Sequence, residues 1–165
     1  MPTKLYWLDE AWPGKVALSA RPRGGDWLGD EVSDWKRTGI DSVLSLLDSQ
    51  EEKDLELEAE STEVRRRGLG FLSYPIRDRQ VPTSEAKLAQ MLEKVDRTLS
   101  SGKNVLIHCR QGVGRSGLVA ACLLVKKGVS PGAAIDKLSS ARGVAVPETE
   151  EQREWIDHYA AALTK

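Results

Sequence analysis

Short apolar runs alternate with longer helical patterns along the chain, and this alternation limits the possible folds more than any other feature of the sequence. Strands that alternate with helices are typical of a parallel sheet. We therefore expect an α/β fold in which a mainly parallel sheet of about four to five strands carries helices on both faces. The apolar runs predict strands at residues 5–8, 16–19, 40–47, 69–76 and 104–108.

Helices are expected in the intervals between these strands and after the last one. Ser130 followed by Pro131 is a typical helix start. Three glycines, at positions 39, 102 and 143, mark expected helix ends. The spacing of apolar residues predicts helices over residues 30–37, 88–99, 116–127, 131–142 and 150–163.

The interval between residues 47 and 69 is rich in charge. Seven acidic residues lie from Glu51 to Glu63, and three arginines follow at 65–67. Ser49 and Glu52 have the spacing of a capping box, which predicts that a single helix begins there. Acids at the start and arginines at the end suit the helix dipole. We interpret this run as a solvent-exposed helix face rather than a partner surface.

The composition is typical of a soluble globular chain. The 165 residues suggest one domain, over residues 1–165, and 40% of them are hydrophobic while 30% are charged. The net charge of −1 gives no basic field for nucleic acid or an anionic membrane. The longest apolar run, at 118–125, is too short to cross a bilayer, and no signal-peptide pattern is present. We expect a cytoplasmic monomer.

One segment combines a nucleophile with groups that bind anions. Residues 108–117, with the sequence HCRQGVGRSG, lie between an expected buried strand and an apolar helix. At such a junction, backbone N–H groups and the helix dipole converge on an anion. Gly112 and Gly114 allow the tight curl, and Arg115 can add a bidentate guanidinium. These surroundings favour a thiolate at Cys109, which makes it a nucleophile toward phosphorus.

Other interpretations of this segment account for less of it. Gly112, Gly114 and Gly117 have the spacing of a dinucleotide fingerprint, which also requires an acid at the end of a second strand. Asp136 has the right separation but falls inside an expected helix. A Walker loop requires a lysine that the segment lacks. A purely structural cysteine would leave the glycines and Arg115 unexplained.

The two cysteines are too few for a disulfide framework and suit a reducing compartment. Cys122 follows Arg115 by seven residues in an apolar helix, which places it about 10 Å further along the axis. That separation is too large for a disulfide with Cys109. We therefore expect Cys122 to pack in the core.

The pattern His-Cys-x5-Arg-Ser at residues 108–116 resembles the signature loop of the cysteine-dependent protein tyrosine and dual-specificity phosphatases. The resemblance extends from about Leu72 to Trp155. A loop late in a compact chain is similar to the small dual-specificity type, including its stand-alone prokaryotic members. The low-molecular-weight phosphatases differ, because their loop lies near the N-terminus. The resemblance implies the phosphatase fold and a phosphocysteine intermediate, and we expect no cofactor. We also expect no metal, because the only histidines, His108 and His158, show no ligand spacing with the cysteines.

The resemblance also implies a role for each loop residue. Cys109 matches the nucleophile, Arg115 the phosphate-binding arginine and Ser116 the hydroxyl that stabilises the departing thiolate. His108 matches a residue that orders the loop by hydrogen bonding. Gln111 stands where the family frequently has a small alanine, at the rim of the pocket. The residues expected to bind substrate together with Arg115 are Arg110, Gln111, Gly112, Val113 and Gly114.

A candidate proton donor lies in the loop after the fourth expected strand. Residues 74–82, with the sequence YPIRDRQVP, resemble the acid loop of the family and place Asp78 at the position of the general acid. An aspartate in a turn can also serve as a local cap alone. Arg77 and Arg79 flank Asp78 and offer positive charge to an incoming phosphate.

Two roles for Gln152 remain open. Thr149 and Gln152 have the spacing of a capping box, so the glutamine can stabilise the start of the last helix. Residues 147–152 also resemble a region where some relatives place a glutamine that positions the hydrolytic water. Its spacing from Trp155 and Ile156 puts it on the helix face turned toward the protein body.

We expect a phosphatase for phosphotyrosine, and also for phosphoserine and phosphothreonine if its pocket is shallow. Phosphorylated proteins are the expected partners. Two alternatives remain open: a catalytically silent module that only recognises phosphate, and a phosphatase for a phosphoinositide or an RNA 5′-phosphate. The sequence does not separate tyrosine-only from dual specificity, because pocket depth depends on the fold.

Overall fold

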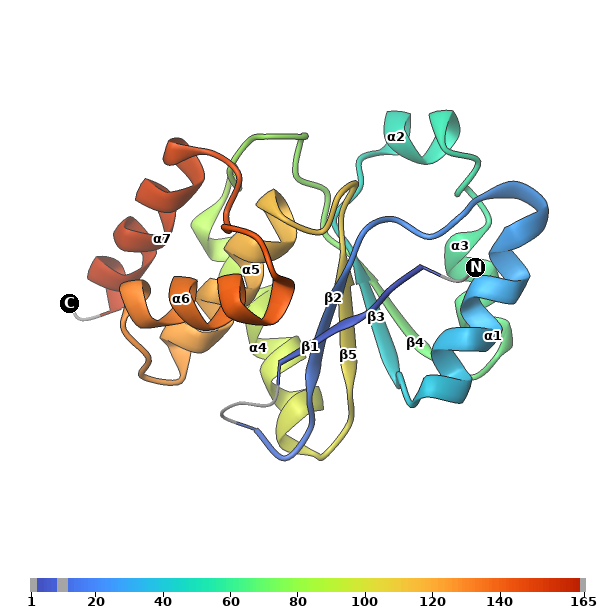
Figure 1. Cartoon of the computed structure of the whole chain (residues 1–165), viewed down its shortest axis with the longest axis horizontal. Coiled ribbons are helices and arrows are strands. Elements are labelled where there is room, and N and C mark those ends of the chain that lie inside the picture. Colours follow the sequence, from blue (N-terminus) through green and yellow to red (C-terminus); the bar gives the residue numbers. More distant parts are fainter. Residues whose placement is uncertain (1–2, 9–11, 164–165) are drawn as a thin grey trace.

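The computed structural model describes residues 3–8 and 12–163 as a central sheet covered by helices (Figure 1). The strands are β1 (Tyr6–Leu8), β2 (Val16–Ser19), β3 (Ser42–Ser45), β4 (Gly70–Ser73) and β5 (Val105–His108). The helices are the short 3-10 helix η1 (Gly25–Trp27), α1 (Leu28–Thr38), α2 (Ser49–Asp54), α3 (Glu60–Arg66), α4 (Glu85–Ser100), α5 (Gly114–Lys126), α6 (Pro131–Arg142) and α7 (Glu150–Leu163).

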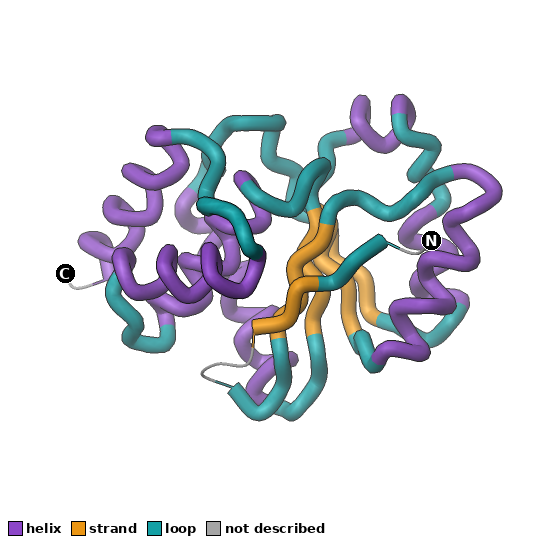
Figure 2. Tube along the Cα trace, viewed as in Figure 1, coloured by secondary structure: helices purple, strands orange, loops and turns teal. Residues whose placement is uncertain are grey.

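The strands form one sheet in the order β1-β2-β5-β3-β4. β1 runs antiparallel to β2, and the other neighbouring pairs are parallel. Ser19 and Ser45 lie opposite His108 on its two sides, so β2, β3 and β5 end at the same level. The loops that follow these strands gather at one end of the sheet (Figure 2). The expected α/β fold with a mainly parallel sheet is confirmed.

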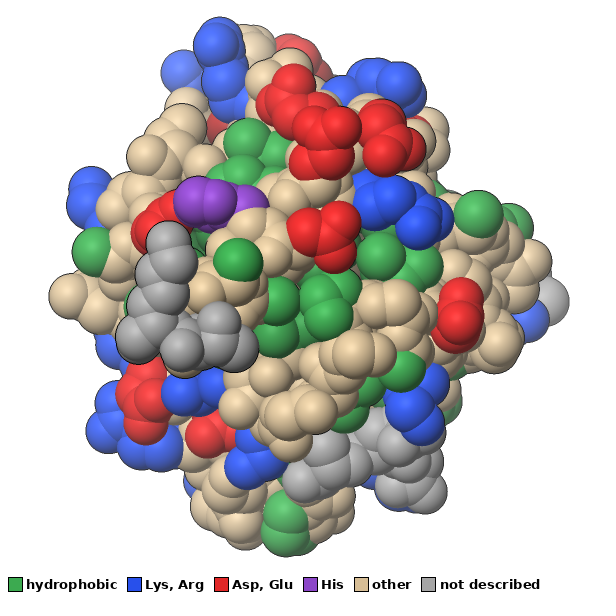
Figure 3. Space-filling model, turned by 90° about the vertical axis from the view of Figure 1, so that its left-hand side faces the viewer, with side chains coloured by type: hydrophobic (Ala, Val, Ile, Leu, Met, Phe, Trp, Pro, Cys, Tyr) green, Lys and Arg blue, Asp and Glu red, His purple; other side chains and the backbone are tan. Residues whose placement is uncertain are grey.

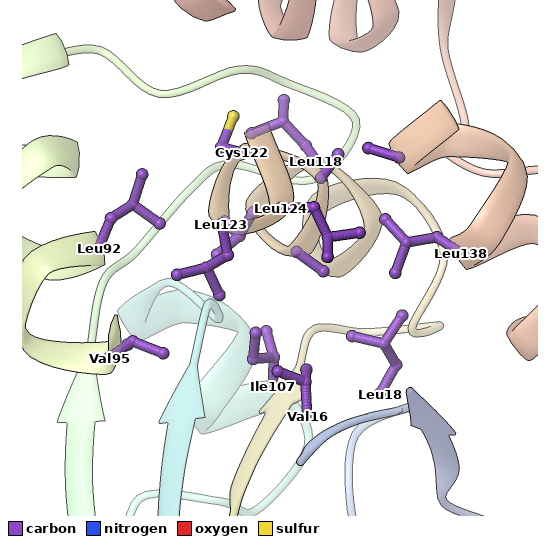
Figure 4. Close-up of a cluster of buried hydrophobic side chains, with 14 of the residues drawn as sticks. Val16, Leu18, Leu92, Val95, Ile107, Leu118, Cys122, Leu123, Leu124 and Leu138 are labelled. Carbon is purple, nitrogen blue, oxygen red and sulfur yellow. The ribbon is translucent and has the colours of Figure 1, made fainter. Parts of the chain in front are cut away.

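Helices cover both faces of the sheet and bury a hydrophobic core on each side (Figure 1). α4, α5, α6 and α7 lie on one face, and α1 and α3 lie on the other. The close-up in Figure 4 shows Leu118 and Leu123 of α5 in the larger core, together with Leu18 and Ile107 of the sheet. Cys122 lies in the same core as a free thiol, as expected, and burial raises its pKa.

The acidic interval between β3 and β4 forms two short helices, so the expected single helix is wrong. Glu56, between α2 and α3, has a left-handed backbone with φ of 56°, which interrupts the helix. The cap is Asp48, which accepts the N–H of Glu51 at 2.9 Å. The Glu51 side chain in turn accepts the N–H of Asp48 at 3.1 Å. The capping box therefore begins one residue before the expected pair, Ser49 and Glu52.

Two members of the acidic run are buried, which contradicts the interpretation of the whole run as a solvent-exposed face. Glu51 is 7% exposed and Glu60 is 1% exposed. Burying a carboxylate without a partner would cost a large free energy. Each of the two pairs with a basic side chain of the candidate site. The interpretation holds for other members, such as Asp54 of α2, which is exposed.

Several element boundaries follow their sequence signals. The hydroxyl of Ser130 accepts the N–H of Ala133 at 3.3 Å, and Pro131 is the first residue of α6. Gly39 and Gly143 end α1 and α6 in a left-handed conformation. β3 and β4 are shorter than the apolar runs that predict them, because the two strands pair over four residues each.

The surface on the α7 side carries acidic and basic side chains around small apolar areas (Figure 3). Within the described ranges, no helix combines the length and the apolar character that crossing a bilayer requires.

Candidate active site

The cysteine of the signature loop lies directly after β5, at the end of the sheet. Cys109 is 2% exposed, and the N–H of Gly112 donates to its sulfur at 3.3 Å. α5 begins at Gly114, so the positive end of its dipole adjoins the same loop. An N–H donor and a helix N-terminus therefore both place positive partial charge beside the sulfur.

Two glycines allow this loop to lie close to neighbouring segments. Gly112 has φ of 75°, and a Cβ there would lie 2.5 Å from the carbonyl carbon of Ser19. A Cβ at Gly114 would lie 2.9 Å from Oε1 of Gln152. A larger residue at either position would therefore push the loop away from the segment after β2 or from α7.

Arg115 is buried, and its orientation is fixed by two other segments. Nη1 and Nη2 donate to the two carboxylate oxygens of Glu51 at 2.6 and 2.8 Å, and Nη1 also donates to the carbonyl of Ile76 at 2.8 Å. Burial disfavours the charged guanidinium. The hydrogen bond with Glu51 and the negative charges of Cys109, Glu51 and Asp78 outweigh burial and raise the pKa of Arg115. The guanidinium is therefore a fixed positive group beside the cysteine.

Asp78 lies where the loop after β4 meets this arginine. Its Oδ1 accepts from Nη2 of Arg115 at 3.2 Å. The aspartate side chain is 51% exposed, so that solvent and an incoming substrate can reach it. Arg77 and Arg79 are exposed on either side, and Arg79 forms an ion pair with Glu148 at 3.5 Å. The structure thus joins the expected acid to the expected phosphate-binding arginine.

His108 is held by a buried carboxylate. Its Nε2 lies 2.5 Å from Oε2 of Glu60, and both side chains are buried. The centre of its ring lies 6.1 Å from the ring centre of Trp35 of α1. The carboxylate and the aromatic ring hold the imidazole, whose Nδ1 has no hydrogen-bond partner among the described residues, so the expected hydrogen bond from His108 to the loop stays a prediction.

Ser116 lies in the first turn of α5 and is fully buried. Its hydroxyl has no hydrogen-bond partner among the residues that the structure describes. Most buried hydroxyl groups are paired. This one can therefore turn toward a negative group at the loop, as the expected role of stabilising the thiolate requires.

Gln152 is buried at the start of α7 and links three segments. Its N–H donates to Oγ1 of Thr149 at 3.1 Å, and its Oε1 accepts the N–H groups of Thr149 and Glu148, which confirms the capping box. Its Nε2 donates to the carbonyl of Gln80 in the acid loop at 3.1 Å. Oε1 also lies beside Gly114 of the cysteine loop. The side chain therefore contacts both loops as well as capping the helix.

Arg142 of α6 binds the outer side of the cysteine loop. Its Nε and Nη2 donate to the carbonyls of Gly112 and Gln111, both at 3.1 Å. Its guanidinium also lies 4.0 Å from the ring centre of Tyr6 of β1. A peptide N–H points opposite to its carbonyl, so holding the carbonyls outward turns N–H groups toward the anion side.

The remaining loop positions lie where substrate can meet them. Arg110 and Gln111 are exposed, and Val113 is half-buried. The carbonyl of Arg110 accepts the N–H of Arg21 at 3.1 Å, which ties this rim to the segment after β2. The structure thus places the expected substrate-binding positions on the rim and floor of one loop.

Three residues of the site were missed by reasoning from the sequence: Glu51, Glu60 and Arg142. Glu60 and Val64 are buried one turn apart on α3, and that spacing is a signal that could have identified the buried glutamate. For Glu51 the periodic spacing of buried positions is a weak signal, because α2 has six residues and so makes less than two turns.

Together these residues supply a nucleophile, an anion site and a carboxyl group at one end of the sheet. A thiol, inward N–H groups and a fixed arginine suit the attack of sulfur on a phosphate, and Asp78 can transfer a proton. Among the described side chains, no three of His, Cys, Asp and Glu gather as a metal site.

Comparisons with known proteins point to the same chemistry. Residues 19–129 match a family described as a DSP-PTPase phosphatase of polymorphic toxin systems. Cyclin-dependent kinase inhibitor 3 of Sus scrofa is 38% identical over 92 residues, which is 54% of this chain and 43% of the relative. The match thus spans less than half of that curated relative.

Solved structures resemble the whole fold. Kinase-associated phosphatase, with serine in place of its catalytic cysteine, superposes with a TM-score of 0.91 at 25% identity, covering 99% of this chain and 97% of that one. The active form of Tk-PTP has a TM-score of 0.75 at 30% identity, covering 95% and 96%.

Proposed function

The chain belongs to the DSP-PTPase phosphatase family, and from this premise we propose that it hydrolyses phosphate monoesters on proteins through a phosphocysteine intermediate. The observation that carries the proposal is the contact between Arg115 and Asp78, at 3.2 Å, beside the buried Cys109. This contact supports a shared anion site for the nucleophile, the phosphate-binding group and the proton donor.

Substrate binding uses groups that are already in place. The substrate phosphate enters between the N–H groups of the loop and the guanidinium of Arg115. Glu51 and the carbonyl of Ile76 hold that guanidinium, so little rearrangement is needed when the anion arrives. Arg142 holds the loop from outside through the carbonyls of Gln111 and Gly112.

In the first step the thiolate of Cys109 attacks phosphorus, and the bond from phosphorus to the substrate oxygen breaks. Asp78 must enter this step protonated, and it gives its proton to that oxygen, so the leaving group departs as a neutral alcohol or phenol. The product of this step is a phosphocysteine, and Asp78 is left as a carboxylate.

In the second step water replaces the sulfur at phosphorus. The Asp78 carboxylate takes a proton from the water as it attacks, and the thiolate of Cys109 leaves. Ser116, whose buried hydroxyl is unpaired within the described chain, donates to this thiolate. The amide of Gln152, in contact with both loops, orients the water.

Phosphorylated proteins are the substrate class that we propose. Two relatives are named for kinases, a cyclin-dependent kinase inhibitor and a kinase-associated phosphatase, and these names support a phosphoprotein substrate. Arg110 and Gln111 are exposed at the rim, where a protein chain around the phosphorylated residue can contact them.

The test is turnover together with trapping of the intermediate. We expect the wild-type chain to hydrolyse p-nitrophenyl phosphate and to release phosphate from phosphopeptides, and acid quenching to yield a phosphorylated protein. Cys122→Ala is the matched control for a substitution of Cys109. Cys122 lies in the core, so its replacement should leave turnover unchanged. A chain that binds inorganic phosphate without turnover would instead be a phosphate-recognition module.

A further inference from the structure

A groove lies between the outer edge of β4 and α4, next to the acid loop. It encloses a cavity of about 440 Å³. One wall is formed by the chain from β4 into the acid loop, and the other by the side of α4. Residues that line it include Leu72, Ser73, Tyr74, Lys87, Met91 and Lys94. We call this cavity the α4 groove.

The strand along this groove has an open edge. β4 is the last strand of the sheet, so its outer side has no neighbouring strand among the described residues. The N–H groups of Gly70, Tyr74 and Ile76 donate to β3 and to the residues directly before and after it. Successive residues of a strand alternate in direction, so Phe71 and Ser73 present their backbone groups outward. An edge of this kind can pair with an extended peptide.

The charge of the groove selects the kind of peptide. Lys87 and Lys94 are exposed, and within the described chain neither has an ion-pair partner. No acidic residue lines the cavity. Met91 and Leu72 provide apolar contact between the two lysines and the strand. An extended segment that carries carboxylates therefore fits the groove better than a neutral or basic one.

The groove also adjoins the acid loop, through a second cavity. A second cavity, of about 450 Å³, shares Pro75 and Thr83 with the α4 groove and is also lined by Arg77 and Gln80. Asp78 lies between these last two residues and contacts Arg115. A peptide in the α4 groove would therefore lead toward the anion site.

We propose that the α4 groove binds an extended acidic segment of the protein substrate, next to its phosphorylated residue. The segment pairs with the open edge of β4, and its carboxylates lie near Lys87 and Lys94. This proposal rests on the proposed phosphatase function and adds the sequence context that the enzyme prefers.

The first test compares phosphopeptides with acidic and with neutral flanking residues. We expect a higher kcat/KM for the acidic peptide, and the difference should shrink at high salt. The double substitution Lys87→Ala with Lys94→Ala should lower kcat/KM for the acidic peptide by about three- to tenfold, the scale of two exposed charge pairs. Turnover of p-nitrophenyl phosphate should not change, because it does not reach the groove.

The matched control removes two exposed arginines elsewhere, by Arg37→Ala with Arg153→Ala. This double substitution changes the net charge by the same amount as the lysine double substitution. Both arginines lie outside the groove. Equal losses in the two double variants would mean a general charge effect and would overturn the proposal. So would acidic and neutral peptides that react equally. Absence of p-nitrophenyl phosphate turnover in the wild type would instead contradict the phosphatase function itself.

A second measurement locates the bound peptide. Hydrogen exchange of the Cys109→Ser chain with an acidic phosphopeptide should show protection at the amides of Phe71 and Ser73. Protection confined to other parts of the surface would overturn the proposal. Binding of the chain to anionic phosphatidylserine vesicles that is lost with Lys87→Ala and Lys94→Ala would also overturn it, because the lysines would then serve a lipid surface.

Discussion

Glu51 and Arg115 form a two-point ion pair inside the protein, with N–O distances of 2.6 and 2.8 Å. The pair joins the segment after β3 to the first turn of α5. We expect Glu51→Gln to weaken it at constant shape, so that the guanidinium loses its fixed orientation. kcat/KM for p-nitrophenyl phosphate should fall, and KM should rise, because phosphate binding depends on that orientation. Steady-state kinetics measures both.

The control for this prediction is Glu52→Gln, the adjacent acid, which is half-buried and does not contact Arg115. A harsher variant, Glu51→Ala, should leave a buried arginine with a weakened set of partners and should destabilise the fold by about 3–5 kcal/mol. Full activity in Glu51→Gln would mean that Asp78 and the carbonyl of Ile76 suffice to hold the arginine.

Cys109→Ser replaces the nucleophilic thiol with an alcohol that is neutral at pH 7. We expect no detectable turnover, while inorganic phosphate still binds, because the loop N–H groups and Arg115 remain. Phosphate release assays and calorimetric titration with phosphate measure the two effects. Appreciable hydrolysis by this variant would refute the covalent mechanism.

Asp78→Asn removes the proton donor at nearly constant shape. Loss of general acid catalysis costs roughly 10²–10⁴-fold in rate. We expect a large loss for phosphotyrosine and a smaller one for p-nitrophenyl phosphate, whose leaving group is stable without a proton. Equal losses for both substrates would remove Asp78 from the acid role.

Gln152→Ala separates the two roles of this residue. The lost cap should lower the free energy of unfolding by about 0.5–2 kcal/mol. Loss of the amide beside both loops should also slow the breakdown of the phosphocysteine, so that rapid quenching finds more phosphorylated protein. If the variant melts earlier without added phosphoenzyme, Gln152 is a cap alone.

The lowered pKa of Glu31 of α1 should make the stability of the fold depend on pH. Burial alone would raise its pKa, but hydrogen bonds from Thr3 and Arg23 outweigh burial and lower it. A lowered pKa contributes stability above the unfolded value, and this contribution is lost as pH falls through the folded value. Glu31→Gln should therefore destabilise the chain at pH 7 in urea titrations. The difference from wild type should vanish in acid, and Glu58→Gln should show no such difference.

The sheet and the cysteine loop could be predicted because their signals are local. Apolar runs and the pattern from His108 to Ser116 each lie in one continuous stretch of sequence. Gln152 could be identified for the same reason, through its spacing from Thr149. In each case the residues that carry the signal are close neighbours in the chain.

The ion pairs of the site could not be predicted, because they join residues far apart in the sequence. Glu51 meets Arg115 across 64 positions, and Glu60 meets His108 across 48. In the sequence Glu51 looks like its exposed neighbours, and the spacing of Glu60 from Val64 indicates a buried position without indicating His108 as the partner. The break at Glu56 was also hidden, because a left-handed glutamate has no strong local signal.

The two buried glutamates also affect how far a sequence motif can be used to infer catalytic rate in other members of the family. They lie at positions 51 and 60, outside the signature loop, yet they anchor its arginine and its histidine. A related chain can have an identical loop but a shorter or apolar stretch after β3. Its loop arginine and histidine would then lack these carboxylate partners. Sorting relatives by two acids with this nine-residue spacing should therefore separate fast from slow members better than the loop motif alone.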